Sequence, residues 1–325
     1  SYASVIVAEA DNSGLSGATR TYLWPAVDDN ITSQFRVRVS QPFVTAVQAA
    51  DVDFANGAGD ASDANAKIKM YTRVLTPNAG GLELKKYDVV NNPVTTTISW
   101  TTTGTGATTT NVKLSYSKDN FATPGIAIMD GALDYTLNDG AFIWQVPDDI
   151  TTTATVKVRV QSWTDLDAKD ESDNAFKIKG DYLISSPTNG AAFKIYDAIQ
   201  NPIPHNITWT TVGGAGGTMG TVNLIAYSTN PIDQYFRDAL NNVYTLANPL
   251  TIVSGYTNTP NASTTYSWQV PDKASPTVVV RVINPVDTTV LKDSTGTFKI
   301  QGALTVTYPN AVNTVLVVNN PETIT

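Results

Sequence analysis

The stretches AFIWQVPDD at residues 141–149 and TVKVRV at residues 155–160 decide the fold of this chain. In the second stretch valine alternates with a charged residue, so an extended strand has one apolar face and one polar face. In the first stretch Pro147 follows the apolar run and marks the edge of a strand, where the loss of an N–H group costs little. Both stretches therefore predict β-strands that bury one face.

The same order of motifs returns later in the chain. WQVPD recurs at residues 268–272 and is followed by VVVRV at residues 278–282. FKIKG at residues 176–180 returns as FKIQG at residues 298–302. Self-similarity over such a length indicates tandem copies of one structural unit.

A weaker copy lies upstream. It has Trp24, FRVRV at residues 35–39 and KIK at residues 67–69, but Trp24 is followed by Pro-Ala-Val instead of Gln-Val-Pro. A serine lies five residues before the first lysine in each of the three copies: Ser62, Ser172 and Ser294. The back half of the unit therefore occurs three times.

A second signature marks the front of each complete unit. YD at residues 87–88 precedes NP at residues 92–93 and ISW at residues 98–100, and the same order returns over residues 196–209. These signatures bound two complete units at residues 71–180 and 181–302. The second of them has a long inserted segment at residues 228–262.

The strand pattern of each unit predicts the fold class. About seven short strands per unit, separated by Gly, Pro, Asn and Asp turns, predict an all-β protein of tandem immunoglobulin-like antiparallel β-sandwiches. Hydrophobic residues make up 42% of the chain, which is enough for packed cores. We find no long helical pattern.

The order Ile-Thr-Trp, Trp-Gln-Val-Pro-Asp, a Val-x-Val strand and Ser-x-x-x-Phe-x-Ile resembles a known repeat. It looks like the tandem Ig-like modules of bacterial and archaeal cell-surface proteins, and it is similar to the domain of fungal Kre9/Knh1-type wall proteins. The resemblance covers nearly the whole chain. Because its motifs are core and turn residues, it implies the fold and a surface location far more than a particular function.

The two ends of the chain look like complementary parts of one further sandwich. Residues 1–70 carry the back of a unit but lack its leading strands and its Ile-x-Trp motif. The tail, residues 303–325, carries the front of a unit: its LTVTYP matches YLISSP at residues 182–187, and its VLVVNNP matches DVVNNP at residues 88–93. We therefore predict an incomplete sandwich that is split between the two chain ends.

Three explanations account for this split. The tail of one molecule can complete the first unit of the next by donating strands, and because such a contact does not close on itself it generates a filament. Alternatively the sequence is an excerpt of a longer repeat protein, or the two ends of one chain pair with each other, which would bend two rigid sandwiches into a tight ring. We favour donation between molecules, with these assembly residues in the tail: Leu304, Val306, Tyr308, Val315, Val317 and Ile324.

Composition excludes several classes of function. The net charge of −8 and the pI of about 4.6 argue against nucleic acid and against anionic membrane surfaces as partners. No apolar run reaches the roughly 20 residues that a membrane helix needs. The chain has no cysteine, which excludes disulfides and thiolate sites. Since it begins with Ser1 and is poor in charge, we expect a processed protein that is extracellular or on the cell surface.

Catalytic residues are not evident in the sequence. His205 is the one histidine of the chain, so neither a Ser–His–Asp triad nor a multi-histidine zinc site is supported. The glutamates are scattered over different units, and no pair of carboxylates is placed for glycosidase chemistry. We therefore predict a protein that is not an enzyme and has no catalytic or cofactor-binding residue.

One acidic loop is a candidate metal site. Asp165, Asp167, Asp170 and Asp173 lie in a predicted hairpin loop, and carboxylates at alternate positions of such a loop bind Ca²⁺ in other proteins. The competing interpretation is that Asp and Ser occupy this loop because they cap their own backbone in turns. Calcium is thus a hypothesis for these four residues.

These observations predict a structural subunit of an extracellular filament, sheath or surface layer, with copies of itself as partners. The alternative is a cell-surface adhesin or carbohydrate-binding module in which the sandwiches present a binding loop. Residues 228–262 are then the place to look for a surface carbohydrate or protein ligand.

Overall fold

Strands account for all the regular secondary structure that the computed structural model describes. The described residues are 6, 21–40, 59–87, 92–104, 110–197, 199, 201–215, 217–302, 306, 308–309, 321 and 323–324. Two β-sandwiches in tandem make up most of them, so the predicted all-β, immunoglobulin-like fold class is confirmed. Within these ranges no helix is long and apolar enough to cross a membrane.

The second unit folds into a sandwich around a core that runs from Met70 to Ile178. One sheet has the order β11-β7-β5, the other has the order β10-β8-β12-β13 with β9 paired to β8, and β6 pairs in parallel with β14. In β12 the alternating valines Val158 and Val160 are fully buried, as the period-two pattern predicts. The strands are β5 (Tyr71–Thr76), β6 (Glu83–Lys85), β7 (Thr95–Thr103), β8 (Asn111–Ser117), β9 (Ile126–Ile128), β10 (Thr136–Leu137), β11 (Ala141–Gln145), β12 (Lys157–Ser162), β13 (Lys169–Glu171) and β14 (Lys177–Lys179).

The third unit repeats this plan around a core that runs from Tyr182 to Ile300. Its sheets have the orders β15-β17-β20 and β16-β23-β21-β18-β19, and β22 pairs with β21. The strands are β15 (Asp181–Ser186), β16 (Ala192–Lys194), β17 (Pro204–Val212), β18 (Thr221–Ser228), β19 (Leu250–Thr257), β20 (Ser263–Gln269), β21 (Ser275–Ile283), β22 (Leu291–Asp293) and β23 (Phe298–Gln301).

A buried tryptophan anchors each core in the same way. Trp100 and Trp209 are almost fully buried, and each indole Nε1–H donates to an asparagine side chain, Trp100 to Asn138 Oδ1 at 2.8 Å and Trp209 to Asn258 Oδ1 at 2.9 Å. A buried indole N–H needs such a partner because losing its water without replacement is costly. The Ile-x-Trp motif of the sequence is therefore a core motif.

The repeated serine joins two strands. The Ser172 N–H donates to the Val158 carbonyl at 2.9 Å, and its hydroxyl oxygen accepts from the Val158 N–H at 3.3 Å. Ser294 does the same for both backbone groups of Val280, at 2.8 Å and 3.3 Å. One residue thereby satisfies two backbone groups of a fully buried valine.

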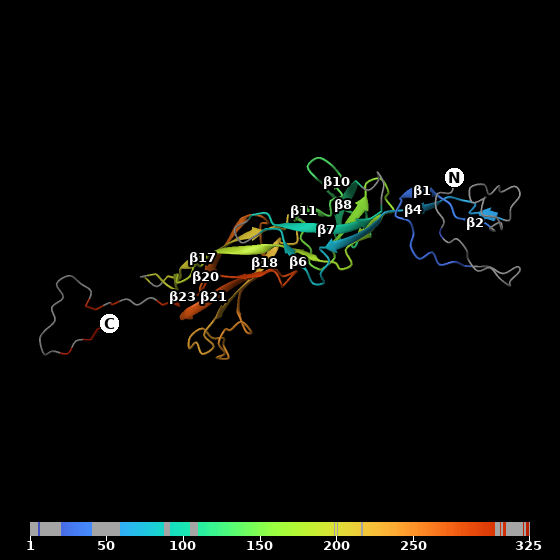
Figure 1. The fold of residues 1–325 in the computed structure, drawn as a ribbon. Coiled ribbons are helices and arrows are strands. Elements are labelled where there is room, and N and C mark those ends of the chain that lie inside the picture. The colour runs from blue at the N-terminus through green and yellow to red at the C-terminus, as the bar shows by residue number, and fades with distance from the viewer. Residues whose placement is uncertain are drawn as a thin grey trace.

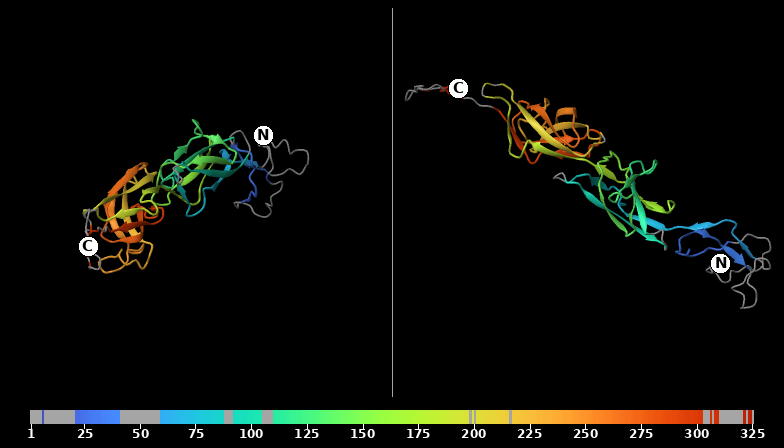
Figure 2. Two further views of the ribbon diagram at one scale, coloured as in Figure 1. Left: turned by 90° about the vertical axis from the view of Figure 1, so that its left-hand side faces the viewer. Right: turned by 90° about the horizontal axis from the view of Figure 1, so that it is seen from above.

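The first unit has no complete sandwich among its described residues. Strand β1 (Thr32–Phe35) pairs with β4 (Ala66–Ile68), and β2 (Arg38–Ser40) pairs with β3 (Gly59–Ala61). The three units follow one another in an elongated row, with β1 and β4 at one end and β21 and β23 at the other (Figures 1 and 2).

We expect Ser172→Ala to destabilise the second sandwich by about 1–3 kcal/mol, because it leaves the buried N–H of Val158 without an acceptor. Ser62→Ala is the matched control. Ser62 makes the same two hydrogen bonds to Val37, but both residues are exposed and water can replace the hydroxyl. Urea denaturation measures both variants, and equal losses would contradict this role for the serine.

Candidate functional site

Among the described residues, the last strand of the first unit is paired along only one of its two edges. Strand β4 pairs with β1 in a sheet of two strands. In the complete units the corresponding strands also bind a parallel strand from the front of the same unit: β14 binds β6 and β23 binds β16. Residues 1–70 lack that front part of the sequence, so the described first unit has no counterpart of β6 or β16.

Apolar side chains of the first unit are exposed where their counterparts are buried. Val37 and Val39 are 40% and 73% exposed, whereas Val158 and Val160 of the second unit are fully buried. Exposed apolar side chains and an unpaired strand edge are both features of binding surfaces.

The predicted assembly residues of the tail are described in part. Leu304, Val315 and Val317 lie outside the described residues. Val306 and Ile324 are 55% and 75% exposed, and Tyr308 is half-buried. These described residues follow β23 at the end of the molecule opposite β1 and β4 (Figures 1 and 2), so they do not meet the first unit of their own chain.

The acidic loop of the second unit binds the end of the first unit. Lys67 Nζ lies 2.5 Å from Asp165 Oδ1 and 3.1 Å from Asp167 Oδ2, and Lys69 Nζ donates to the Asp167 carbonyl at 2.8 Å. The hydrogen bond to Asp165 raises the pKa of Lys67, and the Lys67 ammonium lowers the pKa of Asp167. The Lys67 ammonium thus supplies beside Asp165 and Asp167 the positive charge that a calcium ion would supply in the calcium hypothesis.

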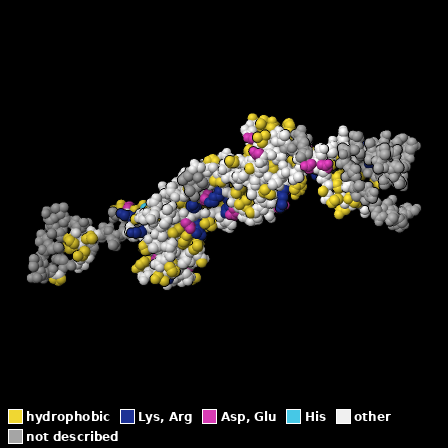
Figure 3. All heavy atoms as spheres, viewed as in Figure 1, with side chains coloured by type: hydrophobic (Ala, Val, Ile, Leu, Met, Phe, Trp, Pro, Cys, Tyr) yellow, Lys and Arg dark blue, Asp and Glu magenta, His cyan; other side chains and the backbone are white. Residues whose placement is uncertain are grey.

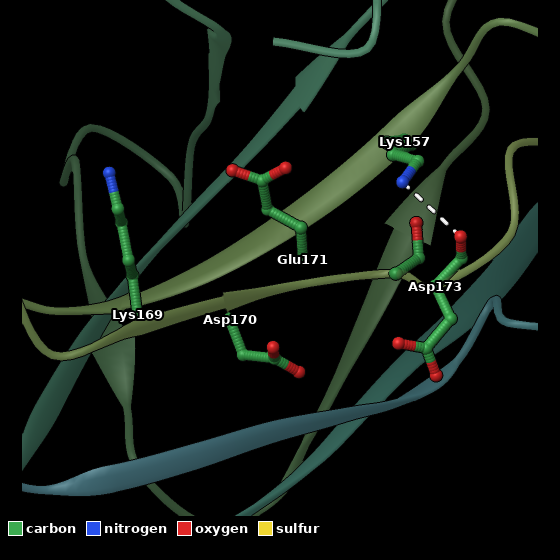
Figure 4. A pocket seen from close by; sticks show the side chains of 6 residues that line it. Lys157, Lys169, Asp170, Glu171 and Asp173 are labelled. Carbon is green, nitrogen blue, oxygen red and sulfur yellow. Dashed lines mark hydrogen bonds between the residues drawn. The ribbon is translucent and has the colours of Figure 1, made fainter.

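The other two predicted calcium ligands face a different part of the chain. Asp170 accepts from the Val74 N–H at 2.8 Å, and Asp173 Oδ2 accepts from Asn78 Nδ2 at 2.9 Å. Figure 4 shows both carboxylates on one side of their strand, with Lys169 and Glu171 on the other side. In the part of the chain that the structure describes, no group of three or more His, Cys, Asp or Glu side chains is placed to hold a metal ion. Asp165, Asp167, Asp170 and Asp173 therefore do not form one such group among the described residues, and calcium stays a hypothesis for them.

The hollow in Figure 4 is built from residues that already bind one another. It is shallow and is lined by Lys157, Lys169, Asp170, Glu171, Ser172 and Asp173. Lys157 Nζ donates to the Asp173 carbonyl at 3.2 Å, and Glu171 pairs with Arg159 at 2.6 Å. These contacts hold strands β12 and β13 together, so the hollow is part of the sandwich framework.

The junction between the two sandwiches uses the same lysines of the repeat. Lys177 Nζ lies 2.5 Å from Asp287 Oδ2 and 3.2 Å from Thr289 Oγ1, and Lys179 Nζ donates to the Thr289 carbonyl at 3.2 Å. The Lys177 and Asp287 side chains are only 9% and 6% exposed. Burial raises the pKa of Asp287, but the Lys177 ammonium and the Thr289 hydroxyl outweigh it and hold the pKa below its ordinary value.

A second contact at this junction involves the aspartate of the WQVPD motif. Asp148 Oδ1 accepts from the Gly214 N–H at 2.6 Å, and Asp148 Oδ2 accepts from Asn261 Nδ2 at 2.7 Å. Gly213 comes so close to Ile150 that an added Cβ would lie 3.2 Å from its Cδ1. Figure 3 shows basic and acidic side chains next to one another midway along the molecule, where the two sandwiches meet.

Sequence reasoning missed the lysines of these junctions. The signal was present, because KIK occurs at residues 67–69 and again at residues 177–179, and an aspartate stands at the same place in the loop of the following unit, Asp165 and Asp287. Both pairs join one unit to the next, which only the structure reveals.

His205 has a structural role. It lies in β17, where its ring stacks on Phe193 with centroids 4.3 Å apart and its Nε2 lies 2.8 Å from the Lys194 carbonyl. His205 therefore covers one side of the core of the third unit.

The inserted segment of the third unit is half packed and half exposed. Phe236 is fully buried and meets Tyr244 edge to face, with ring centroids 5.2 Å apart. Ile232, Tyr235 and Leu240 are 75%, 67% and 82% exposed. The segment is thus anchored to its own sandwich and still presents apolar side chains at the surface.

Comparisons with known proteins concern the fold alone. No family model matches the sequence, and no curated protein matches it. Similar solved structures are fibronectin(III)-like modules of CbhA from Clostridium thermocellum (13% identity, 70% of this chain and 92% of that chain, TM-score 0.20), extracellular domains 3–5 of Drosophila OTK (10%, 71% and 65%, 0.26) and the three N-terminal domains of the highly immunogenic outer capsid protein of bacteriophage RB49 (10%, 73% and 71%, 0.24). No family is assigned. Tandem sandwiches of this kind are typical of extracellular and cell-surface proteins.

We expect a double-mutant cycle of Lys177→Met and Asp287→Asn to give a coupling energy of about 1–3 kcal/mol, because the pair is almost closed to water. The control cycle uses Lys113→Met and Asp134→Asn, whose side chains are 33% and 53% exposed, and should give little or no coupling. Thermal unfolding of the full chain measures both cycles. A coupling at the junction no larger than in the control would show that the lysine does not hold the sandwiches together.

Proposed function

We propose that this chain is a non-enzymatic structural subunit of an extracellular filament, sheath or surface layer, assembled head to tail by β-strand complementation. One observation carries the proposal: β4 lacks, among the described residues, the parallel strand that both β14 and β23 have. An unpaired strand edge binds an extended segment through main-chain hydrogen bonds, with side-chain pockets that give specificity.

The sequence of the tail fits the missing strand. In the third unit the opening strand β15 leads within a few residues to β16, which pairs in parallel with β23. Residues 304–309 match this opening strand, and the residues from there to the NNP of VLVVNNP span the stretch in which β6 and β16 lie in the complete units. The exposed valines Val37 and Val39 of the first unit then gain a partner for burial.

The placement of the two partners favours an open polymer. The first unit and the described residues of the tail lie at opposite ends of an elongated molecule (Figures 1 and 2). A contact between two different surfaces at opposite ends does not close after two copies, so it propagates into a fibre. Pairing of the two ends within one chain would require these ends to meet. Their described residues lie apart at opposite ends of the molecule.

A second candidate function rests on the inserted segment. Ile232, Tyr235 and Leu240 form exposed apolar positions on one segment of the third unit. Such positions suit a cell-surface adhesin or carbohydrate-binding module, with the sandwiches as spacers. Replacement of all three by serine abolishes ligand binding and leaves fibres intact if this segment is a binding site on a structural subunit. If the sequence is instead an excerpt of a longer repeat protein, we expect a monomer that forms no fibres.

Deletion of residues 303–325 should abolish assembly while both sandwiches stay folded, because neither core contains a described residue of the tail. Electron microscopy and sedimentation velocity measure assembly, and circular dichroism measures folding. A synthetic peptide of residues 303–325 should block the growth of full-length fibres by occupying the first unit, whereas a scrambled peptide should not. Fibres of unchanged shape from the truncated chain would refute strand donation by the tail.

A further inference from the structure

The two junctions inside the chain are built from equivalent residues. Lys67 and Lys177 each follow the repeated serine by five positions, and each binds an aspartate in the loop of the next unit, Asp165 or Asp287, at 2.5 Å. The lysine two positions later donates to a backbone carbonyl in both cases, at 2.8 Å and 3.2 Å. The same lysine contact therefore joins the first unit to the second and the second unit to the third.

A glycine contact recurs with it. An added Cβ on Gly104 would lie 3.0 Å from Ile31 Cδ1, as one on Gly213 would lie 3.2 Å from Ile150 Cδ1. Each isoleucine lies shortly after the Asp-Asp pair of one unit, and each glycine follows the Ile-x-Trp strand of the next unit. The units therefore approach one another in the same way at both junctions.

The third sandwich carries these residues at its far end. Lys299 stands in β23 at the position of Lys67 and Lys177, and it is exposed, with no side-chain partner among the described residues. Gln301 stands where Lys69 and Lys179 stand, is exposed as well, and its amide can donate to a carbonyl as those ammonium groups do.

The aspartate of the motif shows the same contrast. Asp148 of the second unit is bound by Gly214 and Asn261 of the third. Its counterpart Asp272 is exposed and has no side-chain partner within the described ranges. Two groups of opposite charge that are used at an internal junction are thus open at the end of the last sandwich.

We propose that this end of the third sandwich, with Asp272, Lys299 and Gln301, docks the first unit of a second copy of the chain. This inference rests on the proposed head-to-tail assembly and specifies its contact. The strands of neighbouring units are nearly continuous: Gly180 alone separates β14 from β15, and Gly302 follows β23 in the same way. A tail that enters the next copy therefore brings Lys299 close to that copy.

The docking contact gives the polymer a single spacing. If the contact between copies repeats the contact between units, all sandwiches along the fibre follow one another at one distance and one rotation. The covalent chain then has no visible boundary in the fibre, apart from the inserted segment of each third unit.

Charge reversal of the full chain tests the contact. We expect Lys299→Glu to raise the critical concentration for fibre formation by about tenfold, because one partner of an interfacial ion pair is replaced by a repelling charge. Lys292→Glu is the control, since Lys292 lies in β22 near the opposite end of the same sheet, and it should change the value less than twofold. Circular dichroism verifies that both variants fold.

Zero-length carbodiimide cross-linking of the assembled protein identifies the partner. The internal pairs Lys67–Asp165 and Lys177–Asp287 serve as positive controls. In fibres of mixed isotopic label, Lys299 should cross-link between chains to acidic residues of residues 1–70. Tail-dependent fibres that lack this cross-link and tolerate Lys299→Glu would overturn the docking contact and leave strand donation standing. A wild-type chain that forms no fibres would overturn both.

Discussion

The parallel strand beside the last strand of each unit is the constraint on which the rest of the structure depends. In both sandwiches this strand ties the front of the unit to its back, with Ile178 opposite Leu84 and Ile300 opposite Phe193. It also covers Ile178 and Ile300, which are almost fully buried. A unit without it exposes a row of backbone groups and the apolar face behind them, and both carry a free-energy cost. The first unit is in this condition among its described residues.

Side chains of the last strand of a unit point alternately to two sides, so the strand both fills its own core and contacts the next unit. In β14 the central Ile178 faces the core of the second unit, while Lys177 and Lys179 reach the loop of the third. Burial of the isoleucine fixes the strand, and the fixed strand positions the two ammonium groups with little further loss of side-chain freedom. Because the next unit begins directly after this strand, folding of one unit prepares the surface that receives the next.

The sequence was sufficient for the architecture and insufficient for the roles of charged residues. Alternating valines, the repeated tryptophans and the turn residues predicted the sandwiches, because these signals are local. The aspartates of residues 165–173 left the identity of their cation open, since alternate carboxylates do not reveal which cation they meet. Lys67 lies almost a hundred positions away along the chain, and only the packing of two units brings it to Asp165. The serine was recognised as repeated, yet its bond to the valine backbone depends on the pairing of two strands.

The proposed strand donation and the proposed docking contact share one premise, the phase of the repeat relative to the chain. Residues 71–302 hold two units, while a unit back precedes them and a unit front follows them. In the proposed assembly, the contacts between copies are of the two kinds that the chain makes internally, the parallel strand within a unit and the lysine contact between units. The proposed interaction between copies therefore needs no kind of contact beyond those that the sandwiches use inside the chain.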